Sequence, residues 1–298
     1  MSTEDVDPRY ARLDSWSTPK VLAAMYEGQL AAAAAVQPAL PAIARAVDDA
    51  ATVLKDRGRI VYVGAGTSGR IGVQDGTELC PTFQWPEERL QFLMAGGMAA
   101  LVRSAEGAED SEADGARAIA EARIGPGDVV IGVAASGTTP YTVGALREAH
   151  AAGAVTIGIA NNADTPLLQS VRHPILLRTG GEAIAGSTRM KAATAQKIAL
   201  NLFSTALMVK LGRVYRGLMV HMRATNAKLR KRAAGIVNRI TGSSPEDAAR
   251  FVEQADGDVK VAILLALGAS TAEARRLLDR HDGHLRAAIG EIRAGRND

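Results

Sequence analysis

The sequence predicts an α/β protein with a doubly wound, five-stranded parallel sheet, N-terminal helices before it and a small C-terminal helical subdomain after it. In the middle of the chain, short apolar runs that stop at glycine or polar residues alternate with helical patterns. Apolar residues make up 47% of the chain but aromatic ones only 4%. An Ala- and Gly-rich composition of this kind suits helices packed closely on a parallel sheet better than an all-β barrel.

Each predicted strand is a short β-branched or apolar run. The five candidates are Ile60 to Val63, Leu90 to Ala95, Val129 to Val133, Val155 to Ile159 and Ile175 to Leu177. An irregular arm is expected over residues 1–20, and the predicted long helices are Val21 to Val36, Pro41 to Arg57, Ala192 to Leu211, and one from after Gly212 to about Ile240. Helix-start signals at Ser244-Pro245 and a capping box at Ser270 and Glu273 indicate further helices. The expected domains are 1–58, 59–240 and 241–298.

Composition and charge narrow the function classes. The single cysteine, Cys80, cannot form an internal disulfide, so a reducing cytoplasm is the expected compartment. A catalytic thiol stays open, although no His near Cys80 in the sequence supports it. Neither a signal-peptide pattern nor a run of about 18 apolar residues is found, which predicts a soluble protein without a membrane partner. The net charge of +3 and a basic cluster at 223–232 without aromatics predict no nucleic-acid partner.

A glycine-rich loop follows the first predicted strand. Gly64, Gly66 and Gly69 permit a tight turn, while Thr67 and Ser68 add hydroxyl donors where a helix begins. This pattern predicts a phosphate-binding loop. It also satisfies the dinucleotide-binding fingerprint, but the next strand is not followed by the carboxylate that a nicotinamide cofactor requires. A third alternative, glycines that serve helix packing only, gives no reason for the two hydroxyls.

Two further polar loops are expected at the same edge of the sheet. The loop after the strand Val129 to Val133 repeats the first one, with a buried run and then hydroxyls at a helix start. Its candidate ligand contacts are Ser136, Gly137, Thr138 and Thr139. The third loop, Gly180 to Lys191, precedes the long apolar helix at Ala192, and its Ser187 and Lys191 either cap that helix or line the pocket. The sequence leaves both roles open.

Two carboxylates are candidates for acid and base chemistry. Glu78 follows the first loop in a turn-rich segment, and Glu109 lies in an acidic stretch after the second predicted strand. Acidic residues around a helix start are commonly structural. A pair of carboxylates facing one pocket can also divide acid and base roles if their environments separate the two pKa values. His281 and His284 have no obvious third ligand, so no metal site is expected.

Taken together, these motifs resemble the N-acetylmuramic acid 6-phosphate etherase family of the sugar isomerase (SIS) superfamily. The resemblance extends over nearly the whole chain. It rests on GAGTSGRIGVQD from Gly64, AEGAED from Ala105, DVVIGVAASGTTPY from Asp128, GSTRMKAATAQK from Gly186, the LMV and TNAKL segments near Leu218 and Thr225, and the C-terminal helices.

The resemblance implies an SIS sugar-phosphate domain, a homodimer with pockets near the subunit contact, and no metal or nicotinamide cofactor. It implies a lyase that eliminates lactate from C3 of an open-chain sugar phosphate and then adds water. By motif, Glu78 matches the glutamate that protonates the leaving lactyl oxygen and Glu109 the second catalytic glutamate, which serves as base for the C2 proton. Gly66, Thr67, Ser68 and the Ser136 to Thr139 loop then match phosphate contacts.

The chain departs from the family pattern near the chemistry. Thr138 stands where the family has arginine, and Leu79-Cys80-Pro81 replaces Cys-Pro-Pro after Glu78. His221 replaces aspartate, Gly217 asparagine and Ala193 glycine. The alternatives are therefore a non-catalytic sugar-phosphate sensor, which the superfamily's glucokinase regulatory protein illustrates, and a lyase or isomerase for a related sugar phosphate.

Overall fold

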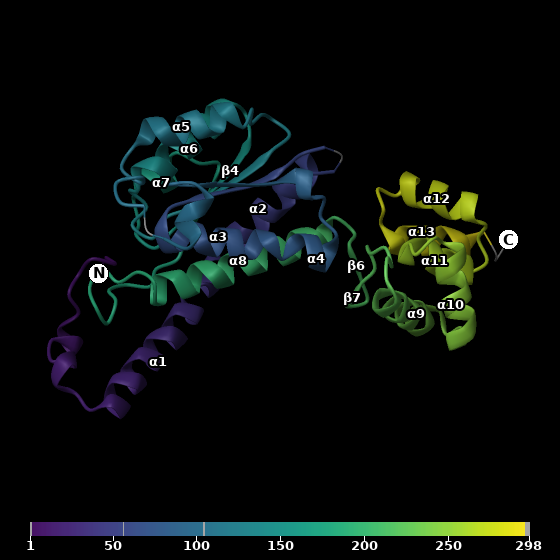
Figure 1. The fold of residues 1–298 in the computed structure, drawn as a ribbon, viewed down its shortest axis with the longest axis horizontal. Coiled ribbons are helices and arrows are strands. Elements are labelled where there is room, and N and C mark those ends of the chain that lie inside the picture. The colour runs from purple at the N-terminus through teal and green to yellow at the C-terminus, as the bar shows by residue number, and fades with distance from the viewer. Residues whose placement is uncertain (1, 56, 104, 296–298) are drawn as a thin grey trace. The chain divides into compact units, whose positions relative to one another are not determined.

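The computed structural model describes residues 2–55, 57–103 and 105–295, which form two compact units (Figure 1). The first unit contains Met1–Glu78 and Pro86–Thr205, and the second contains Leu79–Trp85 and Ala206–Asp298. The predicted domain boundaries at 58/59 and 240/241 stay a prediction, because a compact unit is not by itself shown to fold alone. Positions 1, 56, 104 and 296–298 of the predicted ranges lie outside the described residues.

The first unit is built on the predicted five-stranded parallel sheet. Its strands are β1 (Ile60–Gly64), β2 (Leu90–Met94), β3 (Val129–Val133), β4 (Val155–Ala160) and β5 (His173–Leu176). The strand order is β2-β1-β3-β4-β5, and every pairing is parallel. The chain therefore reverses its direction of winding between β1 and β3, the place where such sheets bind ligands. The predicted fold class is confirmed.

Helices cover both faces of this sheet (Figure 1). The helices around it are α2 (Leu40–Val53), α3 (Gly66–Thr77), α5 (Glu112–Glu121), α6 (Pro140–Ala151), α7 (Pro166–Gln169) and α8 (Lys191–Lys210), with 3-10 turns at Glu87–Arg89 and Met98–Leu101. Val61, Val63 and Val130 join the core beneath α5 and α6. Because side chains alternate along a strand, Tyr62 points to the other face, where Gly72 and Gly76 of α3 lie beside its ring.

The N-terminal segment consists of 3-10 turns at Pro8–Tyr10 and Leu13–Ser15, α1 (Thr18–Ala34), a 3-10 turn at Gln37–Ala39, and α2. By length and composition the helical stretch Thr18–Val53 could cross a membrane, which the expectation of no apolar run overlooked. Such a stretch is weak evidence, because core helices pass the same test. Here α2 buries Ile43 and Val47 in the core and packs on β4 and β5.

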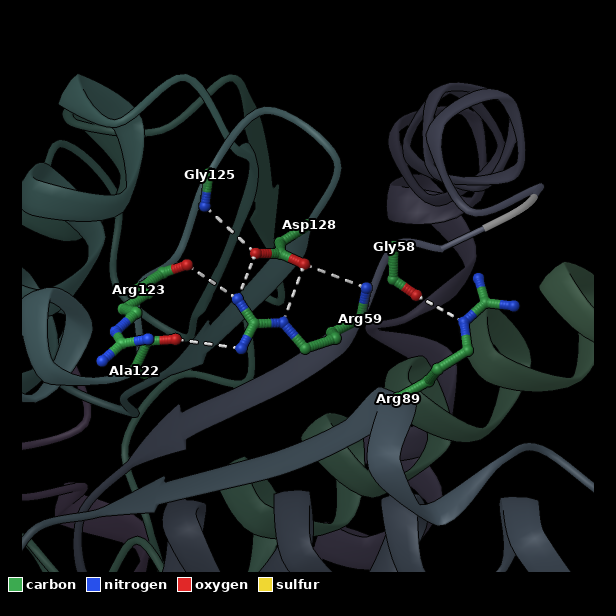
Figure 2. Close-up of polar contacts among 7 residues, drawn as sticks. All are labelled: Gly58, Arg59, Arg89, Ala122, Arg123, Gly125 and Asp128. Atoms are coloured by element: carbon green, nitrogen blue, oxygen red, sulfur yellow. Dashed lines mark hydrogen bonds and ion pairs between the residues drawn. The ribbon is translucent and has the colours of Figure 1, made fainter.

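An ion pair lies at the edge of the sheet where β1 and β3 begin, and it aligns the starts of these two strands (Figure 2). The guanidinium of Arg59, just before β1, donates to both carboxylate oxygens of Asp128, just before β3, at 3.1 and 2.7 Å. It also donates to the carbonyls of Ala122 and Arg123. Burial alone raises the pKa of Asp128, but the hydrogen bonds from Arg59 and the Gly125 amide outweigh it, so the pKa is lowered. Both strands are thereby fixed in register.

Replacing Asp128 by Ala is expected to lower the free energy of unfolding by about 3–5 kcal/mol, since it leaves a partly buried guanidinium without its carboxylate. The contribution of Asp128 to the free energy of unfolding is fully present above the pKa of about 4 that an aspartate has in the unfolded chain. It is lost as the pH falls through the lower pKa that Asp128 has in the folded chain. Urea unfolding at pH 7 and pH 3 measures both effects. Asp114→Ala, which removes an exposed ion pair with Arg117, is the control and should change stability by less than about 1 kcal/mol. If Asp128→Ala and Asp114→Ala lowered stability equally, the stabilising role given to the Arg59–Asp128 ion pair would be wrong.

The second unit is helical apart from one hairpin. Its elements are α4 (Leu79–Phe83), β6 (Val214–Tyr215), β7 (Leu218–Met219), α9 (Ala227–Thr241), α10 (Pro245–Gln254), α11 (Val259–Ala266), α12 (Thr271–Arg280) and α13 (Leu285–Ala294). The predicted helix starts at Pro245 and Thr271 are confirmed, including the capping box of Ser270 and Glu273. The core of this unit centres on α11, whose Ile263 and Leu264 are fully buried.

The helix predicted directly after Gly212 is wrong over 213–226, where the chain forms the β6–β7 hairpin and an irregular segment. Arg216 and Gly217 make a two-residue turn with φ of +50° and +73°. Two-residue hairpins favour such positive φ values because their twist matches that of the strands. The signal was present in the sequence as Val-Tyr and Leu-Met-Val around Arg-Gly.

Candidate functional site

Two hydroxyl-bearing loops leave adjacent strands at the carboxyl edge of the sheet. The first leads from β1 into α3, whose first turn contains Gly66, Thr67 and Ser68; the second connects β3 to α6. Gly64 pairs with Val133 in the parallel register, so both loops begin at the same level. Each loop leads into a helix N-terminus, where backbone amides and the helix dipole favour an anion. The predicted neighbourhood of the two loops is confirmed.

The three glycines of the first loop have different structural roles. A Cβ on Gly64 would lie 2.9 Å from the backbone of Gly69, and a Cβ on Gly69 would lie as close to Gly64. These two glycines therefore let α3 pack directly on the end of β1. Gly66 has a φ of +51° and no atom near the position of a Cβ. Packing thus explains the outer pair, whereas Gly66 forms the open turn.

The second loop is held by the N-terminal arm. The amide of Thr138 donates to Oγ of Ser136 at 3.1 Å, and the carbonyl of Ser136 accepts from the Asn162 side chain at 3.4 Å. Asn162 in turn bonds Thr3, accepting from its amide and donating to its Oγ1, both at 3.0 Å. The carbonyl of Thr3 accepts from the amide of Gly186 in the third loop. Thr3, which is fully buried, therefore connects two of the three predicted loops.

We expect Thr3→Val to lower the free energy of unfolding by about 1–2 kcal/mol, because it removes the hydrogen bonds of the hydroxyl with Asn162 and Glu4 and leaves the half-buried amide of Asn162 short of an acceptor. Amide exchange of Gly186 should become faster. Urea unfolding and hydrogen exchange measure these changes. In the control Thr52→Val, the lost bond joins an exposed hydroxyl to the Asp48 carbonyl, and stability should barely change. If the Thr3 variant matched that control, the arm would not hold the loops.

A buried amide network that sequence reasoning missed joins α3, α8 and β4. Ser68 Oγ donates to Gln196 Oε1 at 2.9 Å, and Gln196 Nε2 donates to Asn161 Oδ1 at the same distance. Gln196 is fully buried and Asn161 nearly so. Asn161 directly follows the apolar run of β4, and Gln196 lies in a long helix rich in apolar residues, which is the signal that could have found them. Their effect is to orient the Ser68 hydroxyl.

The third loop caps α8. Glu182, which is buried, accepts from the amides of Lys191 and Ala192 at 3.1 and 2.9 Å. The Lys191 side chain is itself buried, and its Cδ lies 3.3 Å from the Cβ position of Gly28 in α1. Ser187 is half-buried, and its amide donates to the carbonyl of Ile184. The cap observed for α8 is therefore the Glu182 carboxylate, and the two roles left open for Ser187 and Lys191 stay predictions.

A second buried network fixes the middle of α3 against α8. Tyr62 Oη donates to Asp75 Oδ2 at 2.8 Å, and Ser204 Oγ donates to Asp75 Oδ1 at 3.1 Å. Burial raises the pKa of Asp75, although the hydrogen bonds from Tyr62, Ser204 and Asn201 oppose it. Because α3 is held at this point, the loop at its N-terminus is held as well.

A cavity of about 420 Å³ lies between α3 and α8. Thr67 is the predicted site residue that lines it, together with Ile71, Arg189, Ala193, Thr194, Lys197, Ile198 and Asn201. Arg189 and Lys197 give this cavity two positive charges. Within the described ranges, no group of three or more His, Cys, Asp or Glu side chains could hold a metal ion.

The two glutamates lie at different elements of the first unit. Glu109 is exposed, and its carbonyl accepts from the Tyr141 amide at 3.0 Å, so it lies by the start of α6 at the edge with the loops. Glu78 is the C-cap of α3 and is also exposed. The helix is 12 residues long, which separates Glu78 from the first loop by about 18 Å at 1.5 Å per residue. A single chain therefore brings Glu109, but not Glu78, to the loop edge.

Two family models match the part of the chain that contains the sheet. A family model described as the glucokinase regulatory protein N-terminal SIS domain matches residues 42–150, and the SIS domain model matches residues 103–206. A solved phosphoheptose isomerase from Francisella tularensis is 18% identical, with 64% of this chain and 98% of that chain covered and a TM-score of 0.48.

Full-length relatives are much closer. The N-acetylmuramic acid 6-phosphate etherase of Deinococcus radiodurans is 52% identical over 290 residues, which cover 97% of this chain and 95% of that protein. The etherase of Salmonella agona is 46% identical over 288 residues, 96% of this chain and 97% of that protein. At this identity and coverage, the chain belongs to the N-acetylmuramic acid 6-phosphate etherase family.

Proposed function

We propose that this protein is a carbon–oxygen lyase that converts N-acetylmuramic acid 6-phosphate and water into N-acetylglucosamine 6-phosphate and D-lactate. The observation that carries the proposal is the 52% identity over nearly the whole chain to a relative with this name. The geometry supports it, because two hydroxyl loops at adjacent strand ends suit a phosphate group. Such an enzyme works on cell-wall amino sugars during peptidoglycan recycling, in the cytoplasm.

The reaction begins on the open-chain aldehyde form of the sugar. A base removes the proton from C2, which is acidic because it lies next to the aldehyde. The bond between C3 and the lactyl oxygen then breaks, and an acid protonates that oxygen as lactate leaves. Water adds back at C3 of the unsaturated sugar. Neither step requires a metal or nicotinamide cofactor, since only protons and water are exchanged.

The phosphate group would be held by Gly66, Thr67, Ser68 and the loop Ser136, Gly137, Thr138 and Thr139. The starts of α3 and α6 present their backbone amides at the same edge, and Ser68 is held in place by Gln196. With Thr138 in place of the family's arginine, positive charge would come from Arg189 and Lys197 beside Thr67. Ser187 and Lys191 would support the site through the third loop. Binding energy from the phosphate would position C2 and C3.

Glu109 would act as the base and Glu78 as the acid. Since α3 separates Glu78 from the loops of its own chain, the acid would come from Glu78 of the partner subunit in a homodimer. A second observation supports a dimer. Leu22, Tyr26 and Leu30 form a stripe on α1 at helical spacing, and their exposed fractions are 61%, 64% and 54%. Aligned exposed apolar side chains of this size mark an interface.

Incubation with N-acetylmuramic acid 6-phosphate and an assay for D-lactate test the proposal directly. The expected result is stoichiometric release of D-lactate and N-acetylglucosamine 6-phosphate. When the reaction is run in heavy water, deuterium from the solvent should be incorporated at C2 of the product. Binding without lactate release would instead support a sugar-phosphate sensor, to which the match with the glucokinase regulatory protein domain model corresponds. Deuterium at C2 without lactate release would indicate an isomerase.

A further inference from the structure

The first residues of the N-terminal arm, 2–7, lie across the third loop. A Cβ on Gly181 would lie 2.8 Å from the carbonyl oxygen of Asp5, so the backbone of the arm occupies the space that a larger residue would need there. The amide of Gly186 donates to the carbonyl of Thr3 at 3.2 Å. The arm and the loop before α8 are therefore fitted to each other (Figure 1).

The arm also brings a carboxylate to the third loop. Asp7 is only 5% exposed, and it accepts a hydrogen bond from the guanidinium of Arg9 at 2.6 Å. The hydrogen bonds from Arg9 lower the pKa of Asp7, and the charge of Lys191 lowers it further, although burial opposes both. Since Lys191 is buried at the end of the third loop, the negative charge of Asp7 stabilises its ammonium group.

The second loop is held on one flank by α7 and on the other by the arm. On the first flank, the carbonyl of Gly137 accepts from the amide of Leu167 at 3.1 Å. On the second, the carbonyl of Ser136 accepts from the side chain of Asn162, which is itself bonded to Thr3. Loss of the Thr3 hydroxyl therefore weakens the arm flank and leaves the other flank in place.

We propose that Thr3 is a positioning residue for phosphate binding, and that docking of residues 2–7 and binding of a phosphate monoester stabilise each other. Thr3 acts through Asn162 and Gly186, which belong to or hold two of the loops assigned to the ligand. A ligand that contacts these loops binds more tightly to the form in which the arm is docked. The coupling is reciprocal, because one free energy is shared by both events. The inference rests on the proposed function for the class of ligand, but not on the lyase chemistry.

Calorimetry on the full chain, with N-acetylglucosamine 6-phosphate as the probe, measures the effect on affinity. Thr3→Val should weaken binding at least about fivefold, which is the lower end of typical coupling between two sites. Thr3→Ser keeps the hydroxyl and should bind as the parent does. The control Thr52→Val loses a hydrogen bond to the Asp48 carbonyl, away from these loops, and should also match the parent.

Steady-state kinetics distinguish positioning from a merely structural role. They are measured at a temperature at which circular dichroism shows every variant to be folded. With N-acetylmuramic acid 6-phosphate, Thr3→Val should raise KM by the factor by which it weakens binding. It should leave kcat nearly unchanged, because Glu109 and the bond between its carbonyl and the Tyr141 amide are untouched. A lower kcat with an unchanged KM would contradict the positioning role.

Hydrogen exchange measures the same coupling from the side of the arm. Saturating N-acetylglucosamine 6-phosphate should slow exchange of the Gly186 amide in the parent, because the ligand favours the docked arm. N-acetylglucosamine, which has no phosphate, should not slow it. Thr3→Val should lose most of this protection.

The outcomes separate this inference from the proposed function. Coupling without release of D-lactate would support the role of Thr3 and overturn the lyase. Release of D-lactate with equal affinity and equal KM in Thr3→Val and Thr52→Val would overturn the role of Thr3 alone. A parent protein that binds no sugar phosphate would overturn both.

Discussion

Glu109→Gln is expected to lower kcat for D-lactate release by about 10²- to 10⁴-fold, the usual contribution of a positioned general base. Gln keeps the size and polarity of the side chain but cannot accept the C2 proton. The Tyr141 amide bonds the main-chain carbonyl of residue 109, so the loop and the start of α6 should keep their geometry. KM should change little, because the phosphate loops are untouched. Steady-state lactate release and deuterium exchange at C2 measure the two effects.

Glu106→Gln is the matched control, because it lies three residues earlier in the same exposed loop. It removes one negative charge from that segment without touching the proposed base, so its kcat should stay close to that of the parent. A Glu109→Gln enzyme with unchanged kcat would remove Glu109 from the mechanism. A loss of deuterium exchange in parallel with lactate release would support its assignment as the base.

The second large effect is restoration of activity by mixing two inactive variants. Glu78→Gln alone should lose most turnover, as Glu109→Gln does. If each site takes Glu78 from one subunit and Glu109 from the other, a mixed dimer contains one intact site and one doubly altered site. Equal mixing with subunit exchange makes half of the dimers mixed in a two-fold assembly, so about a quarter of the parent activity should return.

This result discriminates sharply between the two ways of building the site. If both glutamates came from the same chain, every site in a mixed dimer would carry one substitution and no activity would return. The control is the same mixture without subunit exchange, which should stay inactive. A second control mixes Glu109→Gln with itself under the exchange conditions and excludes recovery by refolding. Failure of complementation in a mixture shown to contain mixed dimers would contradict the shared site.

Local sequence signals predicted the strands of the sheet to within about two residues at each end. Buried parallel strands are continuous apolar runs, and those runs end at glycine or polar residues. The glycine and hydroxyl pattern predicted both loops, and the parallel order placed them at one edge. The prediction was wrong after Gly212, where a mixed apolar pattern was interpreted as a helix. The chain forms a hairpin there because Arg216 and Gly217 make a two-residue turn.

The side-chain networks could not be predicted in the same way. Ser68 and Gln196 are 128 positions apart, and Thr3 and Asn162 are 159 apart. Neither pairing leaves a periodic pattern in the sequence. The position of Glu78 depends on where α3 ends, and the structure shows that residue 78 is the C-cap of this helix. Only the folded chain shows that this C-cap lies a helix length away from the hydroxyl-bearing loop at the start of the same helix.

The amino-acid sequence by itself determined the order of strands and helices, the two hydroxyl loops and the family, because short-range periodicity and contiguous motifs carry that information. The tertiary structure alone decided which distant side chains meet. It joined Thr3 to the loop edge and separated Glu78 from the loops of its own chain. Those outcomes follow from burial and packing between segments far apart in the chain, which no local pattern encodes.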